Sequence, residues 1–105
     1  MPAAQAALPD LVDEYLASLR AERGLSAATV TAYRRDLALY LQHLGGAPPE
    51  PAAVSAFVAS QHATGLAAAT VARRLAAVRG FHRFLLAEGF AEADPTRLVD
   101  SPRRS

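Results

Sequence analysis

The chain has 105 residues, 51% of them hydrophobic and 20% charged, with no cysteine and a formal net charge of +1. This length fits one domain with one core, and the composition excludes a disordered chain. No apolar run is long enough to cross a bilayer and no signal peptide is recognisable, so we expect a cytoplasmic protein. Without cysteine, and with scattered histidines at His43, His62 and His82, we expect no disulfide, no metal site and no cofactor.

Every periodic segment of the sequence is typical of an α-helix, because apolar residues recur at three- and four-residue spacing. Ser26 is a favoured N-cap residue, Pro51 suits a first helical position, and Gly45 and Gly89 are typical of helix ends. The predicted helices cover residues 10–23, 26–44, 51–63 and 68–88.

A short fifth helix is expected near the C-terminal end, because Asp94 directly before Pro95 is typical of a helix start. It would run to about residue 99. No segment alternates with period two over strand length, so the sequence predicts an all-α fold, a compact bundle of four main helices plus the short C-terminal helix. We place the domain at residues 10–99, with an N-terminal tail at 1–9 and the start of a linker at 100–105.

The basic residues are all arginines and gather in the second half of the chain, where seven arginines meet four acids. In the helix at 68–88 the large apolar side chains occupy one arc of a helical wheel, and the opposite face is both small and basic. That face holds Ala69, Ala72, Arg73, Ala76, Gly80 and Arg83. Small side chains let a helix approach a groove wall, and arginine reaches phosphates or base edges, so the face suits duplex DNA.

The helix at 26–44 has a second polar face, made of Ala28, Thr31, Ala32, Arg35 and Gln42 with Thr29 and Arg34 at its margins. Alanine and arginine on an exposed helix also occur simply because they favour helix and solubility, and this alternative stays open.

Other polar residues suggest no chemistry. Tyr15, Tyr33, Tyr40 and His82 lie on apolar stripes and are expected in or beside the core, although Tyr33 can also donate to a phosphate. No nucleophile elbow, phosphate loop or paired-carboxylate site is present, so we expect no catalytic residue and no small-molecule substrate.

Three strings carry a resemblance to a known family: LSAATVTAYRRDL at 25–37, GLAAATVARRLAAVRGFHRFL at 65–85, and Asp94-Pro95-Thr96 followed by Ser101-Pro102-Arg103. In this order and spacing they resemble the second helix, the fourth helix and the last helix with linker of the core-binding (SAM-like) domain of Xer tyrosine recombinases. Ala67 departs from the pattern, because relatives often carry a capping serine there.

The resemblance implies an N-terminal domain that grips one face of duplex DNA while a separate C-terminal domain cuts and rejoins strands. Its second and fourth helices cross the major groove. The implied DNA-facing residues are Ala28, Thr29, Thr31, Ala32 and Arg35, with Arg34 near the backbone, and Ala69, Thr70, Arg73 and Arg74, with Ala76 as a further candidate.

The family's catalytic lysine and tyrosine belong to the C-terminal domain, so the resemblance implies that this chain binds DNA without cleaving it. The implied partners are a double-stranded recombination half-site and, in the full-length protein, a related recombinase subunit in a tetramer. That tetramer resolves chromosome dimers at the nucleoid during cell division. The strings at 33–37 and 94–95 lean toward XerD rather than XerC.

Two other functions are compatible with a small helical domain. A protein-interaction module would not bind DNA, and a helix-turn-helix regulator would bind a palindrome as a dimer. The hypothesis that this domain grips one face of duplex DNA, here called the clamp, has one requirement. Two helices of an antiparallel bundle must turn the sides that carry Arg35 and Arg73 toward the same duplex.

Overall fold

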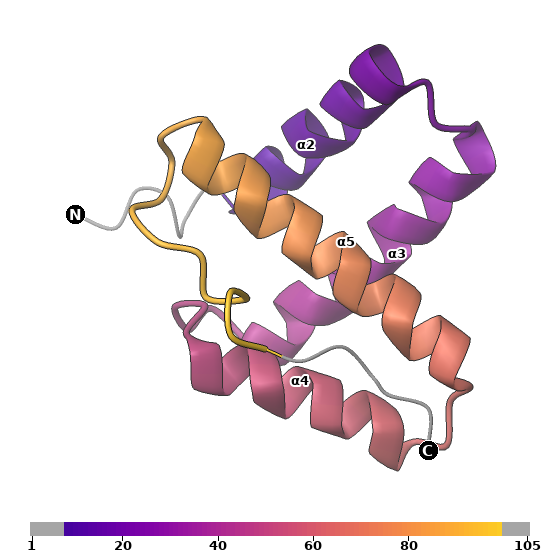
Figure 1. Cartoon of the computed structure of the whole chain (residues 1–105), viewed down its shortest axis with the longest axis vertical. Coiled ribbons are helices and arrows are strands. Elements are labelled where there is room, and N and C mark those ends of the chain that lie inside the picture. The colour runs from indigo at the N-terminus through magenta and orange to yellow at the C-terminus, as the bar shows by residue number, and fades with distance from the viewer. Residues whose placement is uncertain (1–7, 100–105) are drawn as a thin grey trace.

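The computed structural model describes residues 8–99, and its regular structure consists of four α-helices (Figure 1). They are α2 (Leu8–Arg23), α3 (Ala27–Leu44), α4 (Pro51–Ala63) and α5 (Ala68–Ala87). No strand occurs within residues 8–99. The predicted all-α fold is therefore confirmed, and each helix begins and ends within two residues of its predicted bounds.

The ends of α3 follow from its sequence. The Ser26 hydroxyl accepts a hydrogen bond from the Thr29 backbone N–H at 3.1 Å, which satisfies one of the first-turn donors. At the other end Gly45 adopts φ 58°, and its N–H bonds to the Leu41 carbonyl at 3.1 Å. Only glycine takes this left-handed conformation without steric cost, so α3 ends where the sequence predicts.

The first helix begins two residues earlier than the sequence suggests. Leu8, which the sequence placed in the tail, is buried against the core and gives the chain an apolar reason to start the helix there. Pro9 lies in the first turn, where its missing N–H would have no intrahelical partner in any case.

The predicted short helix at the C-terminal end is instead a pair of hydrogen-bonded turns. The Asp94 carboxylate accepts from the Thr96 backbone N–H at 2.8 Å and from its hydroxyl at 2.6 Å. The backbone bonds that follow, Arg97 N–H to Asp94 and Val99 N–H to Thr96, close single turns only. The predicted helix is therefore wrong: Asp94 caps single turns rather than a continuous helix.

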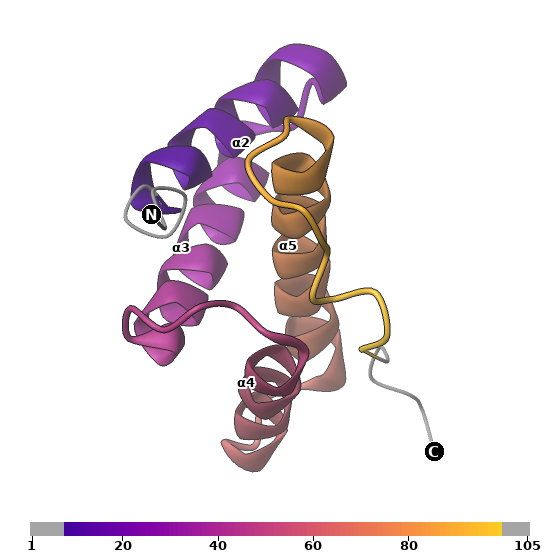
Figure 2. The ribbon, with the colours of Figure 1, turned by 90° about the vertical axis from the view of Figure 1, so that its left-hand side faces the viewer.

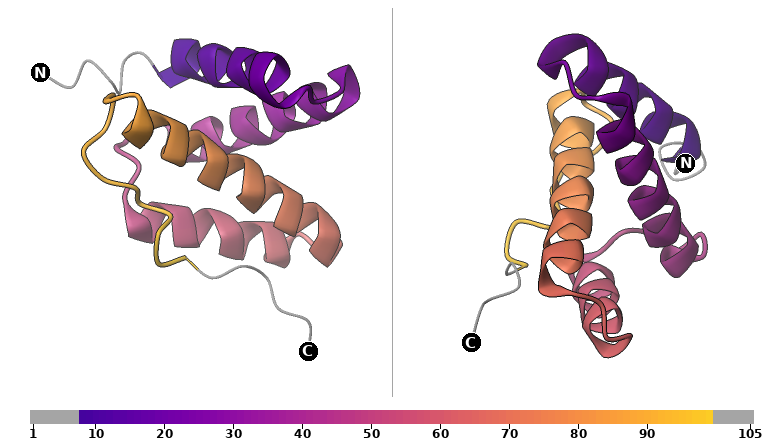
Figure 3. Two further views of the ribbon diagram at one scale, coloured as in Figure 1. Left: turned by 45° about the horizontal axis from the view of Figure 1, so that its top comes forward. Right: turned by 90° about the vertical axis from the view of Figure 1, so that its right-hand side faces the viewer.

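The helices form two hairpins, α2 with α3 and α4 with α5, which appear as two layers in the left view of Figure 3. The contact between the layers is made chiefly by α3 and α5, and these helices cross steeply in Figure 1. Figure 2 shows α2 and α3 on one side of α5, with α4 near its N-terminal end. α3 and α5 therefore cross rather than run side by side, and each is antiparallel to its hairpin partner.

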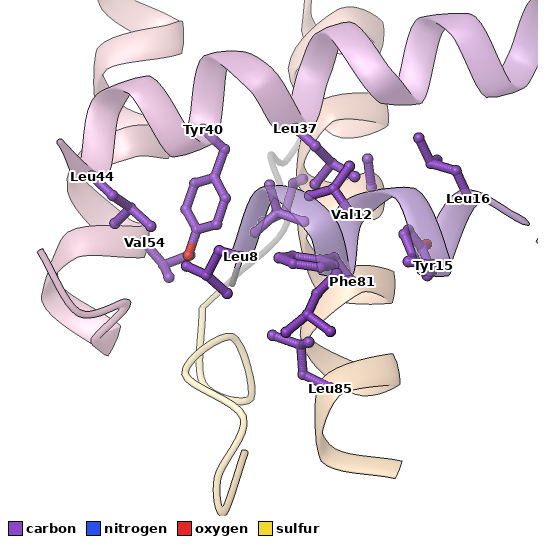
Figure 4. Close-up of a cluster of buried hydrophobic side chains, with 14 of the residues drawn as sticks. Leu8, Val12, Tyr15, Leu16, Leu37, Tyr40, Leu44, Val54, Phe81 and Leu85 are labelled. Atoms are coloured by element: carbon purple, nitrogen blue, oxygen red, sulfur yellow. The ribbon is translucent and has the colours of Figure 1, made fainter. Parts of the chain in front are cut away.

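One core joins all four helices (Figure 4). Leu16, Leu37, Val54 and Phe81, one from each helix, are all nearly or fully excluded from solvent. Within residues 8–99, no helix combines the length and the apolar character that crossing a membrane requires. Burial of this core offsets the conformational entropy lost on folding and holds α3 and α5 in their crossed arrangement. That crossing positions the candidate site.

Candidate nucleic-acid interface

The ten predicted DNA-facing residues all lie outside the core. Six are exposed and four are half-buried. The exposed ones are Ala28, Thr31, Arg34, Arg35, Ala69 and Arg73, and the half-buried ones are Thr29, Ala32, Thr70 and Arg74. The two outer faces derived from helical wheels therefore exist as surfaces.

A buried carboxylate ties the two faces together where α3 and α5 cross. Asp36 of α3 is fully excluded from solvent, and Arg73 of α5 binds it side-on. Arg73 donates from Nε to one carboxylate oxygen at 2.9 Å and from Nη2 to the other at 2.7 Å. Such a two-point pair fixes direction as well as distance, so Arg73 is held in one orientation.

Arg74 completes this network from the neighbouring position on α5. Its Nε donates to Asp36 at 3.1 Å, and its Nη1 donates to the side-chain oxygen of Gln61 on α4. The side chain of Arg74 is only 18% exposed. Arg74 therefore joins three helices, and its predicted contact with DNA stays a prediction.

Arg73 differs from Arg74 because its side chain stays 43% exposed while it holds Asp36. The hydrogen bonds that Arg73 donates to Asp36 raise the pKa of Arg73 above its already high usual value, so Arg73 is a permanent cation. Its Nη1 group takes no part in the bonds to Asp36. Arg73 can thus stabilise the fold through Asp36 and still expose positive charge to a ligand.

The two arginines on α3 are held differently. Arg34 bonds to Asp13 of α2 at 2.5 Å, and both side chains are more than half exposed. Such an exposed pair is weak and easily exchanged for another partner. Arg35 is exposed and has no ion pair within residues 8–99. It is therefore the cation of α3 most available to a phosphate.

A second polar contact lies deeper between the same two helices. The Tyr40 hydroxyl on α3 lies 2.8 Å from Nε2 of His82 on α5, and both residues are buried. Burial lowers the pKa of His82 to about 4, so its ring is neutral near pH 7 and shares one hydrogen bond with the Tyr40 hydroxyl. The sequence-based interpretation of His82 as a hydrogen-bonded core residue is confirmed.

Within residues 8–99, no group of three or more histidine and acidic side chains is arranged to hold a metal ion. What these residues can do together is present fixed positive charge beside small side chains, which suits a polyanion.

Comparison with known proteins indicates the family to which the chain belongs. Residues 12–89 match the sequence family described as the phage integrase N-terminal SAM-like domain. That match covers most of the chain and includes all of α3 and α5. The chain belongs to this family.

The curated relatives of this SAM-like domain are tyrosine recombinases. The chain is 38% identical over 99 residues to tyrosine recombinase XerC of Xylella fastidiosa (strain 9a5c), covering 89% of this chain and 34% of the relative. It is 37% identical over 98 residues to XerD of Agrobacterium fabrum, covering 89% of this chain and 30% of that relative. XerC of Roseiflexus castenholzii is 39% identical, with 88% and 31% covered.

The SAM-like domain thus spans about a third of the length of the relatives it matches. XerC and XerD match about equally well, so the lean toward XerD stays a prediction. No solved structure gives a significant match.

Sequence reasoning about this SAM-like domain missed Asp36 and Gln61 as partners of the arginines. A signal for Asp36 was present, because it is the only acid between residues 27 and 44 and it directly precedes the core residue Leu37. Its partners could not be read from the chain, because Arg73 lies 37 positions away on a helix whose crossing angle no periodicity encodes.

Proposed function

We propose that this chain is the DNA-binding, core-binding domain of a site-specific tyrosine recombinase. The proposal rests on family membership together with one geometric observation. Arg73 of α5 is anchored on Asp36 of α3 yet remains 43% exposed, so one cation is exposed at the crossing of the two helices. A single duplex placed at that crossing could contact both helices at once.

On this surface the arginines and the small residues have different tasks. Arg35 and Arg73 contact phosphates, which supply most of the affinity and set the register. Ala28, Ala32 and Ala69 let the helix backbones come close to the groove. Thr29, Thr31 and Thr70 offer hydroxyls to phosphates or base edges, and Arg34 can exchange Asp13 for a phosphate. With so few polar side chains directed at bases, shape and backbone contacts dominate recognition.

The broader role follows the relatives' names. We propose that strand cleavage and rejoining belong to a catalytic domain outside these residues, and that this domain itself positions the DNA without cutting it. In the whole protein, two related recombinase subunits would assemble as a tetramer on paired half-sites. The cellular task would be the resolution of chromosome dimers at the nucleoid in the cytoplasm, during chromosome partition and cell division.

Salt-dependent DNA binding tests this function. Fluorescence anisotropy with a labelled duplex, measured over a series of salt concentrations, should give a negative linear dependence of log K on log salt. Arg35→Gln should lower affinity and flatten the slope by about 1, because one phosphate contact is lost. Arg97→Gln is the matched control, because Arg97 is exposed in the C-terminal turns and lines a hollow with Pro51 of α4.

Two outcomes would contradict the proposal. A flat anisotropy curve for the unmodified domain would favour a protein-interaction module, and equal effects of Arg35→Gln and Arg97→Gln would mean that binding depends only on net charge. Arg73→Ala is a poorer probe than Arg35→Gln, because loss of Arg73 also removes a cation from the buried Asp36 carboxylate. Binding of one domain per half-site, rather than a dimer on a palindrome, separates the clamp from a helix-turn-helix regulator.

A further inference from the structure

A pocket of about 320 Å³ opens where α2, α3 and α5 meet. Three arginines and two tyrosines contribute its polar groups, and none of its lining residues is acidic. They are Arg23 and Tyr15 of α2, Tyr33 of α3, and Arg79 and Arg83 of α5. We call this the arginine pocket. Arg23 lies on α2, whereas Arg79 and Arg83 lie on successive turns of α5. The three cations therefore come together only in the folded domain.

The pocket continues the predicted DNA-facing side of α5. Ala72, Ala76, Gly80 and Arg83 belong to the small, basic face derived from the helical wheel, and all four line the pocket. Ala72, Ala76 and Gly80 take up little of the space there.

Gly80 is the residue that makes room for the pocket's tyrosine. A Cβ atom at this position would lie 2.1 Å from the Tyr15 hydroxyl oxygen, which is far inside contact distance. Gly80 lies in the middle of α5, where glycine costs about 1 kcal/mol of helix stability relative to alanine. The Tyr15 ring is held from behind by Phe81 and Phe84, with ring centroids 5.9 and 5.6 Å away. The packing thus delivers one hydroxyl to a fixed place.

The pKa of the Tyr15 hydroxyl is affected by several neighbouring groups. Burial raises the pKa of Tyr15 to about 12, nearby Tyr33 adds to this, and the charges of Arg23 and Arg83 oppose it. Arg23, Arg83 and Tyr33 line the same pocket as Tyr15. At neutral pH the hydroxyl keeps its proton and is a hydrogen-bond donor. Donors and cations then surround one space with no acid among its lining residues.

We propose that the arginine pocket binds a phosphate group, with Arg23 and Arg83 supplying charge and Tyr15 and Tyr33 donating hydrogen bonds. Arginine and hydroxyl donors in this arrangement match the three or four oxygens of a phosphate. The group has two possible sources. One is a phosphodiester of the bound duplex, which rests on the proposed function, and the other is a free phosphate ion.

Two titrations of the same domain separate these sources. The first adds inorganic phosphate to the ¹⁵N-labelled domain at constant ionic strength and follows the Gly80 amide by NMR, with chloride as the reference anion. The second measures duplex binding by anisotropy. Both compare the unmodified domain with Arg83→Gln, and Arg97→Gln provides a matched loss of charge outside the pocket. Tyr33→Phe tests the hydrogen-bond donor without changing charge.

A backbone phosphate predicts that Arg83→Gln weakens duplex binding roughly tenfold and flattens the salt slope by about 1, while Arg97→Gln changes neither. A free phosphate predicts a saturable Gly80 shift that Arg83→Gln abolishes, with duplex binding unchanged. If the unmodified domain binds DNA, Arg83→Gln has no effect and phosphate moves no pocket resonance, the pocket inference is wrong and the proposed function stands. If no duplex binds at all, the proposed function fails, and the phosphate titration alone decides the pocket.

Discussion

The two sides of α5 differ in how far their charged and polar side chains are matched by partners. Toward α3 and α4, polar groups are matched to partners: Asp36 with Arg73 and Arg74, and Tyr40 with His82. We call this set of five residues the α3–α5 seam. Toward α2, in the arginine pocket, Arg23 and Arg83 have no ion pair within residues 8–99.

The difference separates arginines that hold the fold from arginines that are available to a ligand. A buried carboxylate such as Asp36 is tolerable only with its cations in place, because an unpaired buried charge is very costly. Arg23 and Arg83 carry no such obligation, so we expect the fold not to require them. Arg73 belongs to both sets, since it stabilises Asp36 and stays exposed. The predictions below begin with the seam and end with the pocket.

The largest expected effect comes from removing both arginines of the seam. Arg73→Ala combined with Arg74→Ala leaves the Asp36 carboxylate buried without a cation. The free energy of unfolding should fall by about 3–5 kcal/mol, measured by urea denaturation near pH 7. A loss below about 1 kcal/mol would mean that Asp36 is hydrated or protonated in the folded domain. The arginines of the seam would then not be needed to hold the fold.

The next largest effect is a pH dependence from His82. Its pKa of about 4 lies below the ordinary value of about 6.5, so between these values the unfolded chain binds more protons. The stabilisation is fully present above about pH 6.5 and is lost as pH falls toward 4, by about 2–3 kcal/mol. Urea denaturation at pH 7, 5.5 and 4.5 measures this loss. His82→Gln should flatten the curve in this window, and an equal slope in that variant would assign the effect to other groups.

A smaller effect is expected at the border of core and pocket. Gly80→Ala forces the Tyr15 hydroxyl to move, although the ring is confined by Phe81 and Phe84. Overpacking of this kind costs about 1–3 kcal/mol, and the better helix propensity of alanine offsets up to about 1 kcal/mol of it. A net loss of about 1 kcal/mol in urea denaturation is expected. A gain in stability would show that Tyr15 can leave the pocket freely.

The smallest effect on stability should come from the pocket arginine itself. Arg83→Gln should change the free energy of unfolding by less than about 0.5 kcal/mol, because an exposed arginine without an ion pair contributes little to the fold. Thermal and urea denaturation beside Arg97→Gln provide the comparison. A loss as large as that of the seam variants would mean that Arg83 is structural, and the contrast between the two sides of α5 would disappear.

The helices could be predicted because their signals are local. The 3.6-residue spacing of apolar side chains, the cap at Ser26 and the stop at Gly45 each act within a few residues. The two polar faces followed from the same periodicity. The segment after Asp94 does not form the predicted helix, because its backbone closes only single turns, with bonds from Arg97 N–H to Asp94 and from Val99 N–H to Thr96.

The rest depends on contacts that join distant parts of the chain. The crossing of α3 and α5 is set by packing of the whole core, so a wheel for each helix gives its faces but not the angle between them. The bond from Arg73 to Asp36 and the meeting of Arg23 with Arg83 both arise from that packing. For this reason the sequence placed Arg73 and Arg74 in one group, although only Arg73 remains substantially exposed.

The central claim is that one duplex contacts the exposed sides of α3 and α5 together. The most direct test is an NMR titration of the ¹⁵N-labelled domain with a duplex, recording which backbone amides shift. The account predicts shifts that gather at residues 28–35 and 69–73 in a single binding event, with α4 unaffected. Shifts confined to α4 or to residues 90–99, or shifts on α3 without any on α5, would contradict it.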